Sequence, residues 1–248
     1  MVDKNKIPAH IAVIMDGNGR WAARRGEARV LGHKKGVDAV MKIVDEASNI
    51  GVQYLTLFTF SAENWKRPEE EIKALMSIVI SSLNAEIERL KSNNVRLLVI
   101  GNIDSLPDDV QKTLHRATKS TSQNTGLSLV LALSYGGKQD IVCAVRKICS
   151  DIQKKKITLS DISGELFRNY LSTANIPDPE LLIRTGGEYR ISNFLLWELA
   201  YTEFYFTRTL WPDFDQEELH KALLDYQGRE KRYGKISEQV RETTIEND

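Results

Sequence analysis

Short apolar runs that alternate with helix-like segments constrain the fold of this chain most strongly. The runs are rich in β-branched and aromatic residues, and a segment with helical periodicity separates most of them. This alternation predicts an α/β protein, in which helices flank a mostly parallel central sheet of about six strands with both faces covered. The expected strands are 10–15, 53–60, 95–100, 127–133, 180–183 and 203–207, and the expected helices lie near 34–49, 69–92, 107–120, 138–154, 160–173 and 215–230.

One domain accounts for the whole chain. Its 248 residues, of which 42% are hydrophobic and 27% charged, are enough for a sizeable core within a single α/β domain. No internal repeat or low-complexity linker divides the sequence. We therefore expect one domain over residues 1–248, with a polar tail from about residue 230 that frays at its end.

The charge balance limits the partners of the protein. Lysine plus arginine and aspartate plus glutamate both number 34, so no global field attracts nucleic acid or an anionic membrane. Any anion site must be local. The N-terminus has no apolar signal region, and no stretch approaches the roughly 18 apolar residues of a membrane span. These features predict a cytoplasmic protein.

The cysteines and histidines do not form a metal-binding pattern. Cys143 and Cys149 lie six residues apart, which suits neither a CxxC pair nor a local disulfide and predicts reduced, structural thiols. The four histidines are scattered without the spacing of zinc ligands. A metal ion in this protein would need oxygen ligands.

Glycine-rich polar loops follow several of the expected strands. Ligands of parallel sheets bind outside the carboxyl ends of the strands, where this chain reads DGNGR, SAENWKRP, GNID, SYGG and RTGGEYRIS. In DGNGR the glycines let backbone N–H groups approach phosphate oxygens, Arg20 adds a bidentate contact, and Asp16 could hold a divalent cation. A plain β-to-α turn has a similar composition. The match of GNGRWA to the dinucleotide fingerprint is weak, because the acidic residue about 20 positions on, Asp38, falls inside an expected helix.

Two further loops carry groups suited to anions. FSAENWKRP at 60–68 combines hydroxyl and amide donors, a carboxylate, an aromatic ring and a cation, although helix capping explains part of it. RTGGEYRISNF at 184–194 places two arginines around a double glycine, which predicts a second anion pocket unless the loop is simply solvated. Three such loops at strand ends favour anion binding over a coincidence of turn composition.

Two apolar segments have alternative interpretations. The helix expected over 69–92 has a broad apolar face that either belongs to the core or lines an apolar tunnel. The segment NFLLWELAYTEFYF at 193–206 is too apolar for a solvated surface and is typical of a core or a subunit interface.

With these residues considered, the chain resembles the cis-prenyltransferase family, and closely its bacterial members that make undecaprenyl diphosphate. The shared motifs are MDGNGRWA, GHKKG, LTLFTFSAENWKRP, NTGLSLVLALSYGG, IRTGGEYRISNFLLWELAYTEFYF and LWPDF, which span nearly the whole chain in the right order. The resemblance implies a homodimeric α/β enzyme with an apolar tunnel. It would use Mg²⁺ to add isopentenyl diphosphate repeatedly, with cis geometry, to farnesyl diphosphate. The implied product is a long polyprenyl diphosphate, the lipid carrier precursor for cell-wall glycans, which would bring the enzyme into transient contact with the inner face of the membrane.

The resemblance also implies roles for individual positions. Asp16 would bind Mg²⁺ on the allylic diphosphate, Glu203 would be the second carboxylate on the metal, and Asn64 would help to remove the proton. Leu127 would lie near the far end of the tunnel. The residues implied to hold the allylic diphosphate or to line the site are Gly17, Asn18, Gly19, Arg20, Trp21, Arg29, His33, Ser61, Ala62, Glu63, Trp65 and Arg67, and those implied to grip isopentenyl diphosphate are Arg184, Arg190, Ile191 and Ser192.

Two other functions are weighed against this one. The chain could be a catalytically silent partner subunit, but silent members of the family have lost site residues that this chain keeps. A dinucleotide-dependent oxidoreductase rests on GNGRWA alone. One departure from the family pattern is Ala62, where a serine or threonine hydroxyl is common. Product length is not predicted, because it depends on the volume of the tunnel.

Overall fold

Six parallel strands form the centre of the molecule. The protein is described by a computed structural model over residues 2–230, and its strands lie within two residues of the expected bounds. Every pairing between neighbouring strands is parallel, so the predicted α/β class is confirmed. The polar tail expected from about residue 230 lies almost wholly outside the described residues. The strands are β1 (His10–Ile14), β2 (Tyr54–Ser61), β3 (Arg96–Ile100), β4 (Ser128–Tyr135), β5 (Leu181–Arg184) and β6 (Glu203–Phe206).

The strand order places a reversal of direction in the middle of the sheet. The order is β3-β4-β2-β1-β5-β6. After β1 the chain places β2 beside it, β3 at the edge of the sheet and β4 between those two, and it then returns to add β5 and β6 on the other side of β1. Ile14 at the end of β1 therefore lies beside Arg184 at the end of β5. Such a reversal opens a crevice at the carboxyl ends of the two central strands, where ligands bind in folds of this kind.

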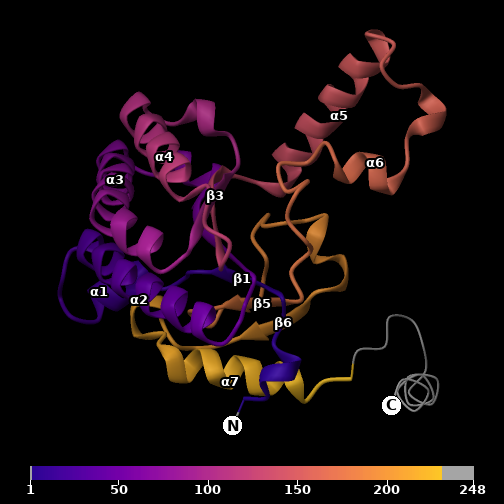
Figure 1. Cartoon of the computed structure of the whole chain (residues 1–248). Helices are drawn as coiled ribbons and strands as arrows, with labels where there is room; N and C mark the ends of the chain where they lie inside the picture. The colour runs from indigo at the N-terminus through magenta and orange to yellow at the C-terminus, as the bar shows by residue number, and fades with distance from the viewer. Residues whose placement is uncertain (1, 231–248) are drawn as a thin grey trace.

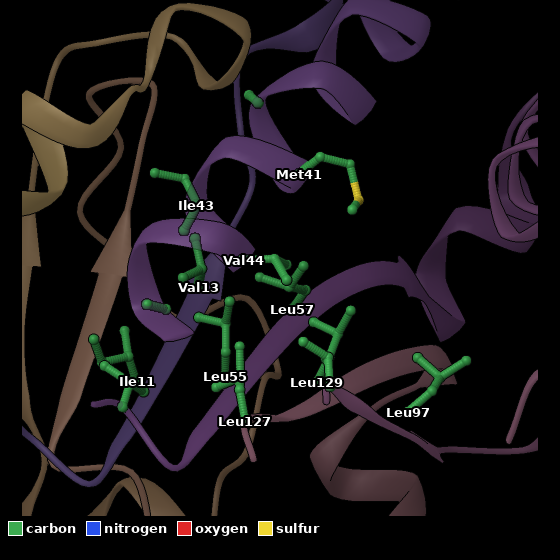
Figure 2. Close-up of a cluster of buried hydrophobic side chains, with 14 of the residues drawn as sticks. Ile11, Val13, Met41, Ile43, Val44, Leu55, Leu57, Leu97, Leu127 and Leu129 are labelled. Atoms are coloured by element: carbon green, nitrogen blue, oxygen red, sulfur yellow. The ribbon is translucent and has the colours of Figure 1, made fainter. Parts of the chain in front are cut away.

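Helices cover one face of the sheet. They are α2 (Arg29–Asn49), α3 (Glu69–Ser92), α4 (Asp108–Thr121) and α7 (Gln216–Gln227). Their buried side chains join those of the strands in the larger core. Figure 2 shows Ile11, Val13 and Leu57 of the strands facing Ile43 and Val44 of α2. Burial of this apolar surface is the main stabilising term of the domain.

Irregular chain covers the other face. Phe194, Leu195 and Leu199 pack there against the opposite side of the strands, and the ring of Phe58 stacks on Phe194 with 4.3 Å between centroids. The prediction that both faces of the sheet are buried is therefore confirmed. The buried residues that cover this second face come from irregular chain and a 3₁₀ turn, and none of them lies in an α-helix. Helices α5 (Gly137–Gln153) and α6 (Gly164–Arg168) instead extend away from the sheet (Figure 1).

Two helical segments differ from the predictions. The DGNGR segment is not a loop, because α1 (Asn18–Ala23) begins within it. The helix expected over 160–173 is short, since Ser163 caps a separate start and α6 covers only Gly164–Arg168. Both thiols, Cys143 and Cys149, are free as predicted, yet they are exposed on α5 and do not contribute to a core. Single turns of 3₁₀-helix cover Lys4–Lys6, Ala62–Lys66, Ile103–Ser105, Leu159–Asp161, Glu198–Tyr201 and Trp211–Asp213.

Candidate active site

A buried ion pair lies at the reversal of the sheet. Asp16 follows β1 and Arg184 ends β5, and Arg184 Nη2 donates to Asp16 Oδ2 at 3.0 Å. The other terminal nitrogen of Arg184 donates to Ser192 Oγ at 2.8 Å and to the carbonyl of Arg190. Only 3% of Arg184 is exposed. A cation this deeply buried needs such partners, because removal from water penalises an uncompensated charge heavily.

Helix α1 brings its first turn to the same place. Gly17 precedes the helix with φ +114°, and a Cβ there would come within 2.9 Å of Leu210, so only glycine fits. The first N–H groups of a helix have no intrahelical partner and favour an anion. Arg20 extends from this turn, with Nη2 at 3.0 Å from Asp16 Oδ1 and Nη1 donating to the carbonyl of Gly186 at 2.7 Å. Asp16 is thus held between two guanidinium groups.

The packing of α1 on α2 depends on glycines whose role was not foreseen from the sequence. A Cβ on Gly32 would overlap the carbonyl oxygen of Asn18, and a Cβ on Gly36 would meet the Asn18 side chain. The two glycines are four residues apart, which puts them on one face of α2. The signal was visible in GHKKG, because glycine inside a helix is costly unless another backbone must come close.

The loop at residues 60–68, which follows β2, is only partly directed toward the crevice at the carboxyl ends of the central strands. Asn64 Oδ1 accepts from the N–H of Ser61 at 3.1 Å, which closes a capping box at the start of the 3₁₀ turn. Arg67 pairs with Glu71 at 3.0 Å. The indole of Trp65 turns away, since its Nε1 donates to Ser134 Oγ at 2.9 Å and its ring meets Phe60 edge-on.

His33 of α2 is a neutral imidazole beside these cations. Burial, and then the positive charge of Arg67, lower its pKa from 6.5 to about 4. Its Nε2 is buried without a hydrogen-bond partner. Arg29 lies one turn earlier on α2, and its guanidinium carbon would lie 3.0 Å from a Cβ built on Gly19. Arg29 therefore lies next to α1, and His33 lines the same cavity as Asn18 of that helix.

These groups surround a cavity of about 390 Å³. The cavity continues into an apolar pocket of about 110 Å³, because Met15, Val37, Val40 and Val79 line both. Among described side chains that are buried without a partner, three belong to this site, namely Asn18 Oδ1, His33 Nε2 and Arg184 Nε. Buried polar atoms are normally satisfied. A polar ligand with both donor and acceptor character would satisfy these three.

The apolar pocket shows that part of the α3 face lines a cavity. Ile78, Val79 and Leu83 of α3 line it opposite Leu129 and Leu131 of β4. The apolar lining expected of a tunnel is present as a pocket of about 110 Å³, and a continuous tunnel stays a prediction. Leu127 is buried in the neighbouring core. It does not line the apolar pocket, whose wall is formed by other leucines.

The structure brings most of the predicted site residues together, but not all. Trp21 is buried, and its Nε1 donates to Asp213 at 2.7 Å. Ile191 packs against the apolar cluster on the face of the sheet that irregular chain covers. Glu63 is exposed and accepts from Asn193 at 2.7 Å. The predicted residues that line the main cavity are Asp16, Asn18, His33, Ser61, Asn64, Arg67, Arg184, Arg190 and Ser192, whereas Gly17, Gly19, Arg20 and Arg29 adjoin it and Ala62 and Trp65 lie outside its lining.

Glu203 does not meet Asp16 within the chain. It begins β6, opposite Leu181 at the start of β5, while Asp16 lies beyond the end of β1. At about 3.3 Å per residue, the two carboxylates are separated by more than roughly 10 Å along the strands. Glu203 instead accepts from Arg229 at 2.7 Å. The expectation that both carboxylates share one metal ion is not met in a single chain.

The site fits a metal ion only together with a ligand that brings oxygens. Within residues 2–230 no group of three or more histidine, cysteine or acidic side chains could hold a metal ion. Among the described residues that line the cavity, Asp16 alone carries a carboxylate, and 29% of its side chain is exposed. Mg²⁺ commonly binds through one or two carboxylates plus substrate phosphates and waters. The donor set therefore fits Mg²⁺ if a diphosphate completes it.

The fold and the site define a class of protein. A cationic, donor-rich mouth at the switch point of a parallel sheet opens into an apolar pocket, which suits an amphiphile with an anionic head and a hydrocarbon chain. No helix within residues 2–230 has the length and the apolar character needed to cross a membrane. The class is thus an α/β protein whose site suits a lipid-like anion.

Comparison with known proteins agrees with this class. Residues 14–234 match the family described as "Putative undecaprenyl diphosphate synthase". An isoprenyl transferase of Geobacter sulfurreducens is 54% identical over 236 residues, covering 95% of this chain and 96% of the relative. The farnesyl-diphosphate-specific ditrans,polycis-undecaprenyl-diphosphate synthase of Haemophilus influenzae is 47% identical over 94% of this chain and 98% of the relative. The crystal structure of lavandulyl diphosphate synthase from Lavandula x intermedia, in complex with dimethylallyl diphosphate, superposes with a TM-score of 0.91 at 37% identity, covering 94% of this chain and 100% of that one.

The chain belongs to the undecaprenyl diphosphate synthase family and is a prenyltransferase. The expected family resemblance is confirmed. The dinucleotide hypothesis loses its remaining support, because Asp38 lies inside α2 and not at the end of a strand.

Proposed function

We propose that the protein is a Mg²⁺-dependent cis-prenyltransferase that condenses isopentenyl diphosphate repeatedly onto farnesyl diphosphate. The product would be a long polyprenyl diphosphate, undecaprenyl diphosphate, that serves as precursor of the lipid carrier for cell-wall glycans. The observation that carries the proposal is the Asp16–Arg184 pair at the mouth of an apolar pocket. It joins two sets of anion donors, as two diphosphate substrates require.

The first donor set suits the allylic diphosphate. The first turn of α1 offers N–H groups from Gly17 onward, and Arg20, Arg29 and His33 surround it. The allylic tail would then enter the apolar pocket behind Met15. In this proposal the bond that must break lies at the boundary between the cationic mouth and the apolar wall.

The second donor set suits isopentenyl diphosphate. Arg184 ends β5, Arg190 and Ser192 lie in the loop that follows it, and all three line the cavity. Two guanidinium groups and a hydroxyl match the oxygens of a diphosphate. Holding both substrates in one cavity makes their reaction effectively intramolecular, which removes much of the entropic barrier.

The chemistry needs stabilisation of a leaving diphosphate. The C–O bond of the allylic substrate breaks, and its diphosphate leaves with the electron pair. The double bond of isopentenyl diphosphate attacks the allylic carbon, and a proton is lost as the new double bond forms. When bound, Mg²⁺ supplies positive charge to the departing diphosphate. Arg20 and the N–H groups of α1 are fixed donors for the same negative charge, so they need little reorganisation during the reaction.

Asn64 has a specific part in this scheme. Its Oδ1 already accepts from Ser61 N–H, and a neutral amide is not a base. We therefore infer that Asn64 acts by donating from Nδ2 to a substrate oxygen. The departing diphosphate, which is the strongest base in the cavity, receives the proton.

We further propose a homodimer that works in the cytoplasm, at the inner face of the membrane through its lipid product. Large apolar side chains are exposed at two places: Leu159, between α5 and α6, is 75% exposed, and Tyr201, just before β6, is 81% exposed. Large exposed apolar side chains of this kind favour an interface. Sedimentation of the purified chain would test the dimer, and a monomer at micromolar concentration would contradict it.

A single incubation tests the proposed function. The purified chain is incubated with farnesyl diphosphate, labelled isopentenyl diphosphate and Mg²⁺, with and without EDTA, and the extracted products are resolved by chain length. We expect long products that disappear with EDTA and with Asp16→Ala. The matched control Asp38→Asn removes an exposed carboxylate that pairs only with Lys35 in the described structure, and it should leave turnover unchanged. No incorporation by a folded wild-type chain would favour the silent-partner function.

A further inference from the structure

The sheet has an open edge at β3. This strand is the last on its side of the sheet, and β4 is its neighbour. The N–H of Arg96 donates toward β4, to the carbonyl of Leu127 at 2.8 Å. The N–H of Leu97 points the other way and donates to Thr121 Oγ1 of α4 at 3.0 Å. Because the backbone groups of a strand alternate in direction, Val99 directs its N–H and its C=O away from β4 as well. These are the groups with which an additional strand would pair.

A groove runs between this edge and α4. Its volume is about 920 Å³, and Figure 1 shows α4 beside β3. The consecutive residues 96–99 of the strand all line the groove, so it follows the edge of the strand and not one face of the sheet. Four residues of a strand extend over roughly 13 Å. The groove therefore has the length and the direction of a short extended peptide.

The groove carries basic side chains and, among the described residues that line it, no carboxylate. Lys112, His115 and Lys119 are exposed, and their spacing of three and four residues puts them on one face of α4. Arg96 lies at the start of the strand, where its Nη2 donates to Ser128 Oγ at 3.1 Å and its Nε is buried without a hydrogen-bond partner. Buried N–H groups normally have an acceptor. The composition of the groove therefore suits an acidic partner.

We propose that this groove binds an acidic, extended segment of another protein, which adds a strand to the sheet beside β3. The outward groups of Val99 supply backbone hydrogen bonds, and the basic residues of α4 select acidic side chains. Side chains of a strand alternate between its two faces, so every second residue of the added strand would face α4. Acidic residues at alternate positions, roughly 7 Å apart, would meet Lys112, His115 and Lys119.

Two other occupants fit this groove less well. A second copy of the chain would bring the same edge with the same lysines, and like charges oppose that pairing. A nucleic acid has no peptide groups to pair with Val99. The whole chain also carries equal numbers of basic and acidic residues, 34 of each, so no wider positive field supports binding to a polyanion.

Binding of a labelled peptide to the full chain tests this surface. The probe is a short fluorescein-labelled peptide in which glutamate alternates with valine, and a copy with lysine in place of glutamate is the charge control. Fluorescence anisotropy measures the affinity of the wild-type chain for each peptide. We expect saturable binding of the glutamate peptide, tighter than binding of the lysine peptide by roughly tenfold or more and weakened by added salt.

Two variants separate the contribution of charge from that of backbone pairing. Lys112→Glu combined with Lys119→Glu reverses the charges on α4 and should weaken binding of the glutamate peptide by roughly tenfold or more. Val99→Pro removes the outward N–H, at an edge position where proline is tolerated, and should weaken binding by roughly fivefold. The matched control combines Lys42→Glu with Lys73→Glu, which reverses two exposed lysines of α2 and α3 and should leave the affinity unchanged.

Each variant is first checked for folding and activity. Prenyl transfer should match that of the wild type, because none of the substituted residues lines the catalytic cavity. If urea unfolding shows that Val99→Pro does not fold, hydrogen exchange of the Val99 amide in the wild-type chain takes its place. Slower exchange of this amide in the presence of the glutamate peptide is then the expected result.

The proposal fails on any of several outcomes. Absent binding of the glutamate peptide, or equal binding of both peptides, would overturn it. Unchanged affinity in Lys112→Glu with Lys119→Glu would show that the groove is not the site. Unchanged affinity in Val99→Pro, or unchanged exchange of the Val99 amide, would overturn strand addition. A loss in the control with Lys42→Glu and Lys73→Glu as large as in the α4 variant would mean that any basic surface suffices.

Discussion

The guanidinium group of Arg184 donates to the carboxylate of Asp16 at 3.0 Å, although 168 residues separate them in the sequence. The contact exists because β1 and β5 are parallel neighbours, with Ile14 beside Arg184. Since each residue follows or ends its strand, the pair lies at the carboxyl edge of the sheet. It connects the loop proposed for the allylic substrate with the loop proposed for isopentenyl diphosphate.

Arg184→Lys should impair catalysis while keeping the charge. Arg184 contacts Asp16 and Ser192 through different nitrogens, and a lysine ammonium cannot span both. Loss of one charge-assisted hydrogen bond, worth about 1.5–3 kcal/mol, predicts a fall in kcat/KM for isopentenyl diphosphate of roughly 10–100-fold. Steady-state kinetics at saturating farnesyl diphosphate would measure it. Arg168→Lys is the control, because Arg168 pairs with Asp178 and does not line the cavity. Equal kinetics for wild type and Arg184→Lys would refute the assigned role.

Gly32→Ala should separate α1 from α2. The new Cβ would overlap the carbonyl oxygen of Asn18, and overpacking of this kind costs about 1–3 kcal/mol. We expect a lower midpoint in urea unfolding and a loss of activity, because α1 carries Gly17 and Arg20. Gly164→Ala has open space around its Cβ, with Trp197 at 4.0 Å, and should leave both properties unchanged. An active, equally stable Gly32→Ala variant would be incompatible with the close packing described.

Leu83→Phe should shorten the product. Leu83 lines the apolar pocket of about 110 Å³, and a larger ring there takes space that the growing chain needs. Chain-length analysis of extracts would show the shift, with the first condensation little changed. Ser81→Phe lies on the exposed side of α3 and serves as the control. Unaltered lengths with Leu83→Phe would mean that the product takes another path.

Acid should destabilise the fold through His10. Burial lowers the pKa of His10 from 6.5 to about 4, while its Nδ1 donates to the carbonyl of Pro177 at 2.6 Å and its Nε2 accepts from Thr56 at 2.7 Å. The unfolded chain binds a proton at higher pH than the folded one. Stability is therefore complete above about pH 6.5 and is lost as the pH falls toward 4, by roughly 2 kcal/mol at pH 5.

Urea unfolding at pH 7 and pH 5 measures this loss. A His10→Gln variant removes the titrating group but can keep polar contacts, so its own stability should vary less between the two pH values. If wild type and variant lost the same free energy of unfolding on acidification, His10 would not be the source.

Much of the fold follows from local sequence. Runs such as HIAVI and YLTLFTFS are β-branched and aromatic, and each became a strand within two residues of its expected bounds. Helix α3 begins directly after Pro68 with three glutamates in its first turn, as local rules predict. The polar loops at the strand ends were also visible, because parallel strands place their carboxyl ends at one edge.

Local rules failed where a neighbour in space decides the conformation. Asn18 and Gly19 favour a turn, yet α1 is helical because Gly32 and Gly36 let it pack closely on α2. Trp65 was expected in the site, but its indole donates a hydrogen bond to Ser134 and turns away from the cavity.

The sequence by itself determined the parallel α/β class, the strands and the polar segments that follow them, because apolar periodicity and turn chemistry are properties of short segments. Only the tertiary structure decided that Asp16 meets Arg184, that Glu203 lies at the start of its strand, away from the carboxyl edge where Asp16 lies, and that residues of α2, α3 and β4 enclose an apolar pocket. Those relationships depend on strand order, register and side-chain direction. They are fixed by the packing of segments far apart in the chain, which no local pattern contains.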